Sequence, residues 1–236
     1  MSLRYKTIIF DLFGTLVDSF SVTAYKTAVT TMAEMLQAPH ARFTYLWEDG
    51  TYHQLISGDF ANIDETLSFI CRELAIEIND RQLKEVINVR YEFTRQALQP
   101  QAEVIEALST LKQQGCRLGL ISNCAPDVSL LWESTPFAQL IDVPIFSCTA
   151  RLQKPDPRIY RLAAEQLEVS PDTCLYVGDG SDRELSGAMA VGMCPVLFRT
   201  PLHDAYDVQR KDLDGWDGHV ICHMRDLLSG EFLEEY

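Results

Sequence analysis

The sequence predicts an α/β fold: a doubly wound parallel sheet of the Rossmann-like kind, with an α-helical region inserted after its first strand. Two observations predict this fold class. Short apolar runs that resemble buried strands alternate with stretches of helical apolar spacing, and one long stretch with helical spacing alone follows the first run. Repeated units of strand and helix build a parallel sheet with helices on both faces.

The composition is that of a folded protein with one or two compact units. The chain has 236 residues, of which 47% are hydrophobic and 23% charged, and a chain of this length buries enough apolar surface to fold without disulfides. The formal net charge of −14 repels phosphate backbones and anionic lipids, so we expect a small-molecule substrate and neither nucleic acid nor membrane as partner. Seven cysteines without a CxxC pair, and no signal-peptide or membrane-spanning segment, favour a cytoplasmic protein.

Five apolar runs are predicted as strands of the sheet. Residues 7–10 form a β-branched run that ends in Asp11, and a turn at Gly14 follows at once. Further runs of this kind cover residues 118–122, 145–147, 174–177 and 196–198. Their nearly continuous apolar character is typical of strands that are buried on both faces.

Three helices are predicted between these strands. Apolar side chains at helical spacing cover residues 104–111, 155–167 and 184–191. The first and the last of these stretches are each followed by a glycine, which is typical of a helix C-terminus. The tail from about residue 203 is acidic, and no element is predicted there.

Residues 17–98 are predicted to form a helical cap, inserted between the two parts of an α/β core that comprises residues 1–16 and 99–236. Helical apolar spacing covers residues 22–36, 63–74 and 83–93, with no strand-like run between them. Because this region follows the first strand directly, we expect it to lie over the carboxyl end of that strand. Ligands bind at that end of open α/β sheets, so a substrate cleft is expected between cap and core.

Polar residues gather in four short stretches at or near the ends of predicted strands. The stretches are Asp11-Leu12-Phe13-Gly14-Thr15-Leu16, Ser122-Asn123, Lys154-Pro155-Asp156 and Gly178-Asp179-Gly180-Ser181-Asp182-Arg183-Glu184. Each stretch alone is as typical of a turn or a helix cap as of a catalytic site. In this order and spacing, however, they resemble the four motifs of the haloacid dehalogenase superfamily, with the helical region at the position of that superfamily's common cap.

This resemblance implies a hydrolase in which Asp11 is the nucleophile and forms a covalent ester with the substrate. It implies that Ser122 donates a hydrogen bond to a transferring oxygen, with Asn123 assisting. Lys154 would neutralise charge on both the nucleophile and the substrate. Thr15, in the first motif, is placed with Asn123 among the substrate-binding residues.

The resemblance also implies a Mg²⁺ site. Its ligands would be Asp11, the backbone carbonyl of Phe13, Asp179 and Glu184, an all-oxygen set of the kind that Mg²⁺ prefers. Asp182 is the alternative to Glu184 as the second acid of the fourth motif. Glu184 is preferred because its spacing to the following Gly-Ala pair is the one that the superfamily's acid usually has.

Phe13 departs from the pattern of the superfamily's phosphatases. They usually carry a second Asp at this position, which protonates the leaving oxygen and then activates water, an effect worth about 10²–10⁴-fold in rate. Alkyl phosphate esters are therefore expected to be poor substrates unless the cap supplies another acid, for which Glu48, Asp49 and His53 are candidates. The metal is not excluded, since Phe13 keeps its backbone carbonyl.

An aromatic residue at position 13 favours dehalogenase chemistry, because a halide leaves without a proton and the superfamily's dehalogenases carry an aromatic residue there. Those enzymes bind the substrate carboxylate with a cap arginine, for which Arg42 is the candidate. They work without a metal, whereas Asp179 and Glu184 are both kept here. Two carboxylates beside Asp11 would repel it in the absence of a cation, which favours a metal site.

The favoured hypothesis is Mg²⁺-dependent hydrolysis of a small phosphorylated metabolite through an aspartyl-phosphate at Asp11. Three alternatives stay open. The first is metal-independent 2-haloacid dehalogenation, and the second is cleavage of a phosphonate carbon–phosphorus bond with Lys26 as a Schiff-base lysine. The third is a catalytically silent protein that keeps the fold for binding.

Overall fold

The computed structural model describes residues 5–19, 21–199 and 216–228. Within these residues six strands form one sheet, in the order β3-β2-β1-β4-β5-β6, and every pairing is parallel. The strands are β1 (Thr7–Phe10), β2 (Arg117–Ser122), β3 (Val143–Phe146), β4 (Cys174–Gly178), β5 (Cys194–Phe198) and β6 (His219–Ile221). This sheet confirms the predicted fold class. The strand order reverses at β1, and open α/β sheets bind ligands at such a switch point.

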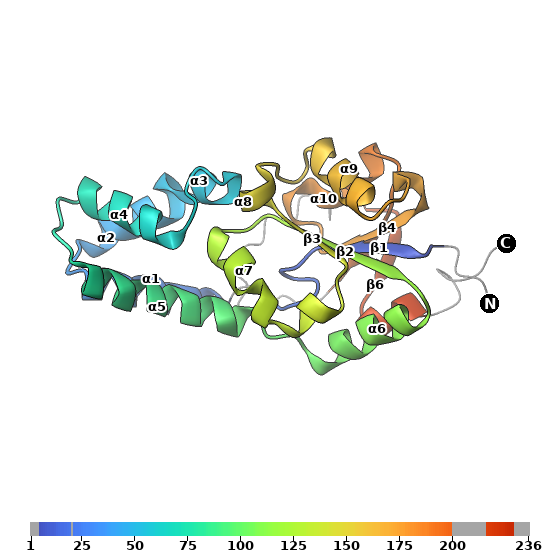
Figure 1. Cartoon of the computed structure of the whole chain (residues 1–236), viewed down its shortest axis with the longest axis horizontal. Coiled ribbons are helices and arrows are strands. Elements are labelled where there is room, and N and C mark those ends of the chain that lie inside the picture. The colour runs from blue at the N-terminus through green and yellow to red at the C-terminus, as the bar shows by residue number, and fades with distance from the viewer. Residues whose placement is uncertain (1–4, 20, 200–215, 229–236) are drawn as a thin grey trace.

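Helices cover both faces of the sheet (Figure 1). The helices of this part of the chain are α6 (Ala102–Gln113), α7 (Pro126–Leu131), α8 (Ser147–Ala150), α9 (Pro157–Gln166) and α10 (Glu184–Ala190), and the 3₁₀ turns are η2 (Trp132–Ser134), η3 (Pro136–Gln139), η4 (Pro171–Thr173), η5 (Ser181–Arg183) and η6 (Met224–Leu228). Side chains alternate along β1, so that Ile8 and Phe10 pack with α6 on one face while Ile9 packs with α9 and α10 on the other.

A helical region lies between β1 and α6 in the sequence. It consists of α1 (Val22–Met35), α2 (His40–Tyr45), the π-helix η1 (Leu46–Gly50), α3 (Tyr52–Ser57), α4 (Ile63–Glu73) and α5 (Asp80–Ala97). Polar side chains set where its helices begin: Asn62 caps α4, and Asn79 forms a capping box with Gln82 at the start of α5. The helices bury an apolar cluster separate from those of the sheet, and they form one elongated end of the molecule (Figure 1).

Among the described residues, the helices of this region make their most extensive contacts with the rest of the protein at two places. Helix α5 packs on α7, where Arg90 Nε donates to Asp127 Oδ2 at 2.8 Å. Helix α3 packs on α8 at Gly58, which has a φ of +79°, and a Cβ at this glycine would lie 2.0 Å from the carbonyl oxygen of Cys148. Arg151 Nη2 also donates to the Gly58 carbonyl at 3.4 Å. Only glycine therefore allows the second contact.

The structure differs from the predicted elements at several points. Ser147, predicted to end a strand, begins α8. The helix predicted from residue 155 begins at Pro157, because the Asp156 side chain accepts the amide of Arg158 and caps the helix there. Strand β6 was not predicted, since three residues at the edge of a sheet carry too short a pattern.

The two ends of the predicted cap, Val17 and Leu98, are buried in the apolar cluster that packs on the sheet. The division into core and cap at these positions stays a prediction. Most of the acidic tail, residues 200–215 and 229–236, lies outside the described residues. Within the described part of the chain, no helix is both long and apolar enough to span a membrane.

Candidate active site

The four motifs meet at the carboxyl end of the central strands. Asp11 directly follows β1, Ser122 is the last residue of β2, and Asp179 directly follows β4. Because these strands are neighbours and parallel, their ends lie at one edge of the sheet. Lys154 joins them from the loop between α8 and α9. All four side chains are buried, with exposed fractions between 1% and 5%.

Lys154 bridges two carboxylates. Its Nζ donates to Asp11 Oδ1 at 2.5 Å and to Glu184 Oε2 at 2.6 Å. Glu184 is the first residue of α10 and is fully buried. The sequence separation of these residues is large, but the strand ends and the start of α10 bring them together.

Asp11, Asp179 and Glu184 form an acidic cluster, in which each residue offers one carboxylate oxygen within 4.8 Å of the other two. The turn after β1 makes room for it: Gly14 has a φ of +83°, and a Cβ there would lie 2.2 Å from Asp179 Oδ2. Asp179 Oδ1 accepts the backbone amide of Ser181 at 2.9 Å. A side chain at position 14 is therefore excluded both by conformation and by space.

The cluster carries more negative charge than Lys154 balances. Burial, and to a smaller extent Asp179, raises the pKa of Asp11 to about 6, although Lys154 opposes the shift. Burial and then Asp11 raise the pKa of Glu184 well above its usual value. Burial alone would lower the pKa of Lys154, but Asp11 and Glu184 raise it well above its usual value. A further cation in the site would relieve this repulsion.

Three buried polar atoms at this end of the sheet have no hydrogen-bond partner among the described residues. They are Asp11 Oδ2, Thr15 Oγ1 and Ser122 Oγ. Buried polar atoms are rarely left unpaired, so such atoms indicate a place for a ligand, an ion or water. All three belong to residues that the sequence predicted for the site.

The side chain of Asn123 contacts other residues of the site, while its predicted role toward a substrate stays a prediction. Its Nδ2 donates to the Lys154 carbonyl at 3.1 Å and to Asp182 Oδ2 at 2.7 Å, and its Oδ1 accepts the Lys154 amide at 2.8 Å. The amide therefore holds the backbone of Lys154 in place. These contacts are those of a positioning residue, and they also engage Asp182, the alternative second acid.

The residues predicted within the helical region do not gather in the same way. Arg42 is exposed on α2, which lies at the end of the helical region farther from the sheet (Figure 1). Glu48 and Asp49 lie in η1, and His53 is exposed on α3. Their predicted roles toward a substrate stay predictions. Phe13 is half-buried and packs against the apolar cluster of the sheet.

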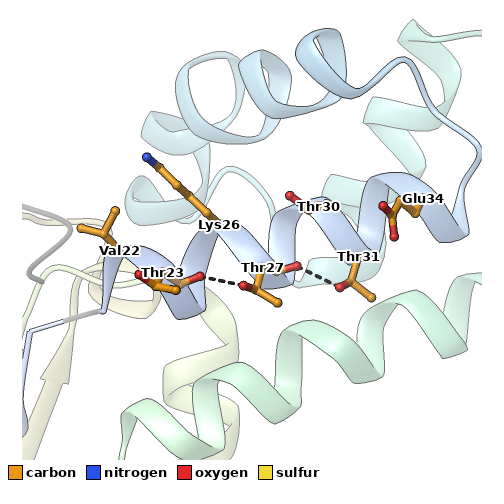
Figure 2. A pocket seen from close by; sticks show the side chains of 7 residues that line it. All are labelled: Val22, Thr23, Lys26, Thr27, Thr30, Thr31 and Glu34. Carbon is orange, nitrogen blue, oxygen red and sulfur yellow. Dashed lines mark hydrogen bonds between the residues drawn. The ribbon is translucent and has the colours of Figure 1, made fainter.

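Lys26, the candidate Schiff-base lysine, lies on α1. It lines an open groove of about 510 Å³ whose walls come from α1 alone. Figure 2 shows Lys26 pointing away from Thr23, Thr27 and Thr31. The hydroxyls of Thr27 and Thr31 donate to the backbone carbonyls of Thr23 and Thr27, respectively. No member of the acidic cluster lines this groove.

Two tyrosines of the site were not predicted. Tyr176, in the middle of β4, donates to Glu184 Oε2 at 2.9 Å, and Tyr160 of α9 donates to the Glu184 carbonyl at 3.0 Å. Both are fully buried, and their rings meet edge to face. The sequence did offer a sign of the Tyr176 contact, since a tyrosine inside an otherwise apolar buried strand needs an acceptor for its hydroxyl.

Comparison with known proteins agrees with this architecture. A family profile described as haloacid dehalogenase-like hydrolase matches residues 5–192. A curated relative from Pseudomonas putida, named (S)-2-haloacid dehalogenase, is 25% identical over 236 residues, which cover 93% of each chain. A relative from Pyrococcus furiosus, named glyceraldehyde 3-phosphate phosphatase, is 26% identical over 234 residues, 95% of this chain and 92% of the relative.

Among solved structures, a HAD family enzyme from Bacteroides thetaiotaomicron in complex with magnesium and inorganic phosphate has a similar fold. The TM-score is 0.61 at 16% identity, over 83% of this chain and 94% of that one. The chain belongs to the haloacid dehalogenase-like hydrolases. Its relatives include both phosphatases and dehalogenases, so membership leaves the reaction open.

Proposed function

We propose that this protein is a Mg²⁺-dependent phosphatase that hydrolyses a small phosphorylated metabolite through an aspartyl-phosphate at Asp11. The observation that carries the proposal is the gathering of Asp11, Asp179 and Glu184 around a single buried ammonium. The excess of carboxylates disfavours the ionised form of Asp11, which the nucleophile needs, and a divalent cation offsets that cost. Without a metal ion, Asp179 would only repel the Asp11 carboxylate and would not help its attack on the substrate.

The oxygen atoms at this end of the sheet fit the ion. Mg²⁺ binds through one or two carboxylates and keeps several waters, and Asp11 Oδ2 is buried without a partner among the described residues. Asp11 and Asp179 would hold the ion together with the backbone carbonyl of Phe13, and the resemblance adds Glu184. When bound, Mg²⁺ supplies positive charge that offsets the repulsion between an anionic substrate and the carboxylates.

The residues of the site would carry out the hydrolysis in two chemical steps. The Asp11 carboxylate attacks phosphorus, so that an Asp11–phosphorus ester bond forms and the bond to the leaving oxygen breaks. Water then attacks the acyl phosphate, which releases inorganic phosphate and restores the carboxylate. Lys154 offsets negative charge on the transferring group throughout, and the hydroxyls of Thr15 and Ser122 are available to donate to its oxygens.

Phe13 limits the substrates that this site can hydrolyse well. It offers no proton to the leaving oxygen, so the proposal favours substrates whose leaving group is a weak base. Alkyl phosphates would need an acid from elsewhere, with Glu48, Asp49 and His53 as the candidates in the helical region.

The test is hydrolysis of p-nitrophenyl phosphate, whose leaving group needs little protonation, with Mg²⁺ and with EDTA. We expect turnover with Mg²⁺ only, and a loss of about 10⁴-fold or more in Asp11→Asn. The surface variant Lys112→Met serves as control, since this lysine pairs with Asp142 away from the cluster. Turnover that persists in EDTA or in Asp11→Asn would contradict the proposal.

Metal-independent 2-haloacid dehalogenation is the second candidate, and Phe13 is the observation that favours it. An aromatic residue suits a halide, which leaves without a proton, and four relatives carry the name of such an enzyme. Chloride release from 2-chloropropionate in EDTA, lost in Asp11→Asn, would establish this function instead. If neither reaction occurs while a metabolite still raises the Tm, the silent binding protein becomes the better hypothesis.

A further inference from the structure

Protein donors occupy both carboxylate oxygens of Glu184. Oε2 accepts from Lys154 Nζ at 2.6 Å and from the Tyr176 hydroxyl at 2.9 Å, while Oε1 accepts from the backbone amide of Gly180 at 3.0 Å. A carboxylate has about four acceptor positions. The three donors therefore leave room for at most one further partner on Oε1.

The backbone of β4 closes the space beside that oxygen. A Cβ on Gly178 would lie 2.3 Å from Oε1 and 2.6 Å from the carboxylate carbon, so the glycine packs directly against the Glu184 head group. Glu184 is 0% exposed. A magnesium ion brings several waters with it, and the packing around Glu184 does not provide for them.

Asp11 differs from Glu184 in this respect. Its Oδ1 accepts from Lys154, but its Oδ2 has no hydrogen-bond partner among the described residues. Asp11 can therefore take on a new partner without losing an old one. A metal ion bound by Glu184 would have to displace the ammonium, the phenol or the amide.

We propose that Glu184 is a positioning residue for Lys154 and not a ligand of the metal ion, and that the Tyr176 hydroxyl fixes it in this role. The inference deepens the proposed function and rests on it. Lys154 is held from two sides, by Asp11 and by Glu184, at similar distances. Tyr176 comes from a buried central strand, so its hydroxyl is a fixed point for the carboxylate.

The role of Glu184 follows from the charge of Asp11 during the reaction. The Asp11 carboxylate loses its own negative charge when it becomes an ester. Lys154 then has Glu184 as its remaining carboxylate partner. A fixed Glu184 therefore keeps the ammonium in place from the formation of the intermediate until its hydrolysis. A Glu184 that bound Mg²⁺ instead would not hold the ammonium during this interval.

The first test is Mg²⁺ binding by isothermal titration calorimetry, together with steady-state kinetics on p-nitrophenyl phosphate. Glu184→Gln is expected to keep the Mg²⁺ Kd within about threefold of wild type while its kcat falls by about 10²-fold. Tyr176→Phe should lower kcat by about tenfold with KM and the Mg²⁺ Kd unchanged. Asp179→Asn should weaken Mg²⁺ binding by about 30-fold or more. Tyr45→Phe, on the exposed surface of α2, is the control.

The second test is a double-variant cycle on thermal unfolding without metal. Lys154→Met and Glu184→Gln together should lower the Tm by less than the sum of the two single changes, because each removes the same pair. Lys154→Met with Tyr45→Phe should be additive. This cycle needs neither activity nor Mg²⁺ binding.

The outcomes separate the inference from the proposed function. If Glu184→Gln loses Mg²⁺ binding as Asp179→Asn does, or if the cycle is additive, the positioning role is wrong. If the wild-type protein neither binds Mg²⁺ nor turns over phosphate esters, the proposed function fails, and the thermal cycle alone decides whether Glu184 serves Lys154.

Discussion

Two buried ion pairs hold different parts of this molecule together, and they differ in charge balance. At the junction between α5 and α7, Arg90 meets a single carboxylate, Asp127, which also accepts the hydroxyl of Thr94. The rings of Trp47 and Phe93 lie 5.8 and 5.3 Å from the guanidinium carbon of Arg90. This pair is neutral as a whole, although Asp127 Oδ1 is buried without a hydrogen-bond partner among the described residues.

The two ion pairs that Lys154 makes at the end of the sheet belong to a cluster with surplus negative charge. Lys154 faces Asp11 and Glu184, and Asp179 lies close to both carboxylates. The surplus charge destabilises the fold, and the cation of the proposed function would relieve this cost. The comparison teaches that burial of charge alone does not mark a functional site. A buried pair in balance connects elements, whereas a buried cluster with surplus charge is a candidate site for a cation.

Breaking the balanced pair should have the largest effect on stability. Arg90→Met leaves Asp127 buried without its cation, and we expect a loss of about 3–5 kcal/mol in the free energy of unfolding. Urea unfolding followed by tryptophan fluorescence measures it. The double variant Arg90→Met, Asp127→Leu should recover much of the loss. A single variant no less stable than the exposed Arg81→Met would refute the structural role.

Removing the cation of the unbalanced cluster should instead act on turnover. Lys154→Met is expected to lower kcat on p-nitrophenyl phosphate by about 10²–10³-fold, since the transferring charge loses its counterion. The acid limb of the pH–rate profile should also move to higher pH, because Lys154 is the group that lowers the pKa of Asp11. A profile that stays in place would show that Lys154 does not act on Asp11.

The surplus charge should appear in the pH dependence of stability. Burial raises the pKa of Asp11 from 3.8 to about 6, so between these values the folded protein binds the proton more tightly than the unfolded chain. Stability therefore falls as pH rises through this window, and the cost is complete above pH 6. In EDTA at pH 7.5, Asp11→Asn should be more stable than wild type by about 3 kcal/mol, and this gain should shrink toward pH 4. Equal stability of the two proteins at pH 7.5 would contradict the raised pKa.

The smallest expected effect lies in the helical region, away from both pairs. Asn79→Ala removes the capping box at the start of α5 and should cost about 1 kcal/mol in stability. The kcat on p-nitrophenyl phosphate should not change, since Asn79 contacts none of the charged cluster. A clear loss of turnover would show that the two regions are coupled more closely than the contacts indicate.

The parallel strands explain why so much of the site was predictable from the sequence. Once Asp11, Ser122 and Asp179 are assigned to strand ends, the register of the sheet alone brings them together, whatever the details of packing. No strand register fixes the position of Arg42, which lies on a helix. Its place depends on how α1, α2 and α5 pack on one another, and short-range spacing does not carry that information.

Side-chain orientation was the other part that the sequence did not reveal. The role of Asn123 toward a substrate stays a prediction, but the pairing of its side-chain amide with the backbone of Lys154 was not predicted. Tyr176 was predicted only as a strand residue, because its partner Glu184 is defined by the turn between β4 and α10. Both contacts depend on backbone positions within loops, which motif spacing leaves undetermined.

Gly58 gives the helical region a second point of attachment, separate from the Arg90 pair. Because position 58 tolerates no side chain in this arrangement, even a methyl group there would break the contact between α3 and α8. The Arg90 pair and the two buried chain connections at Val17 and Leu98 would then be left to hold the helical region against the sheet.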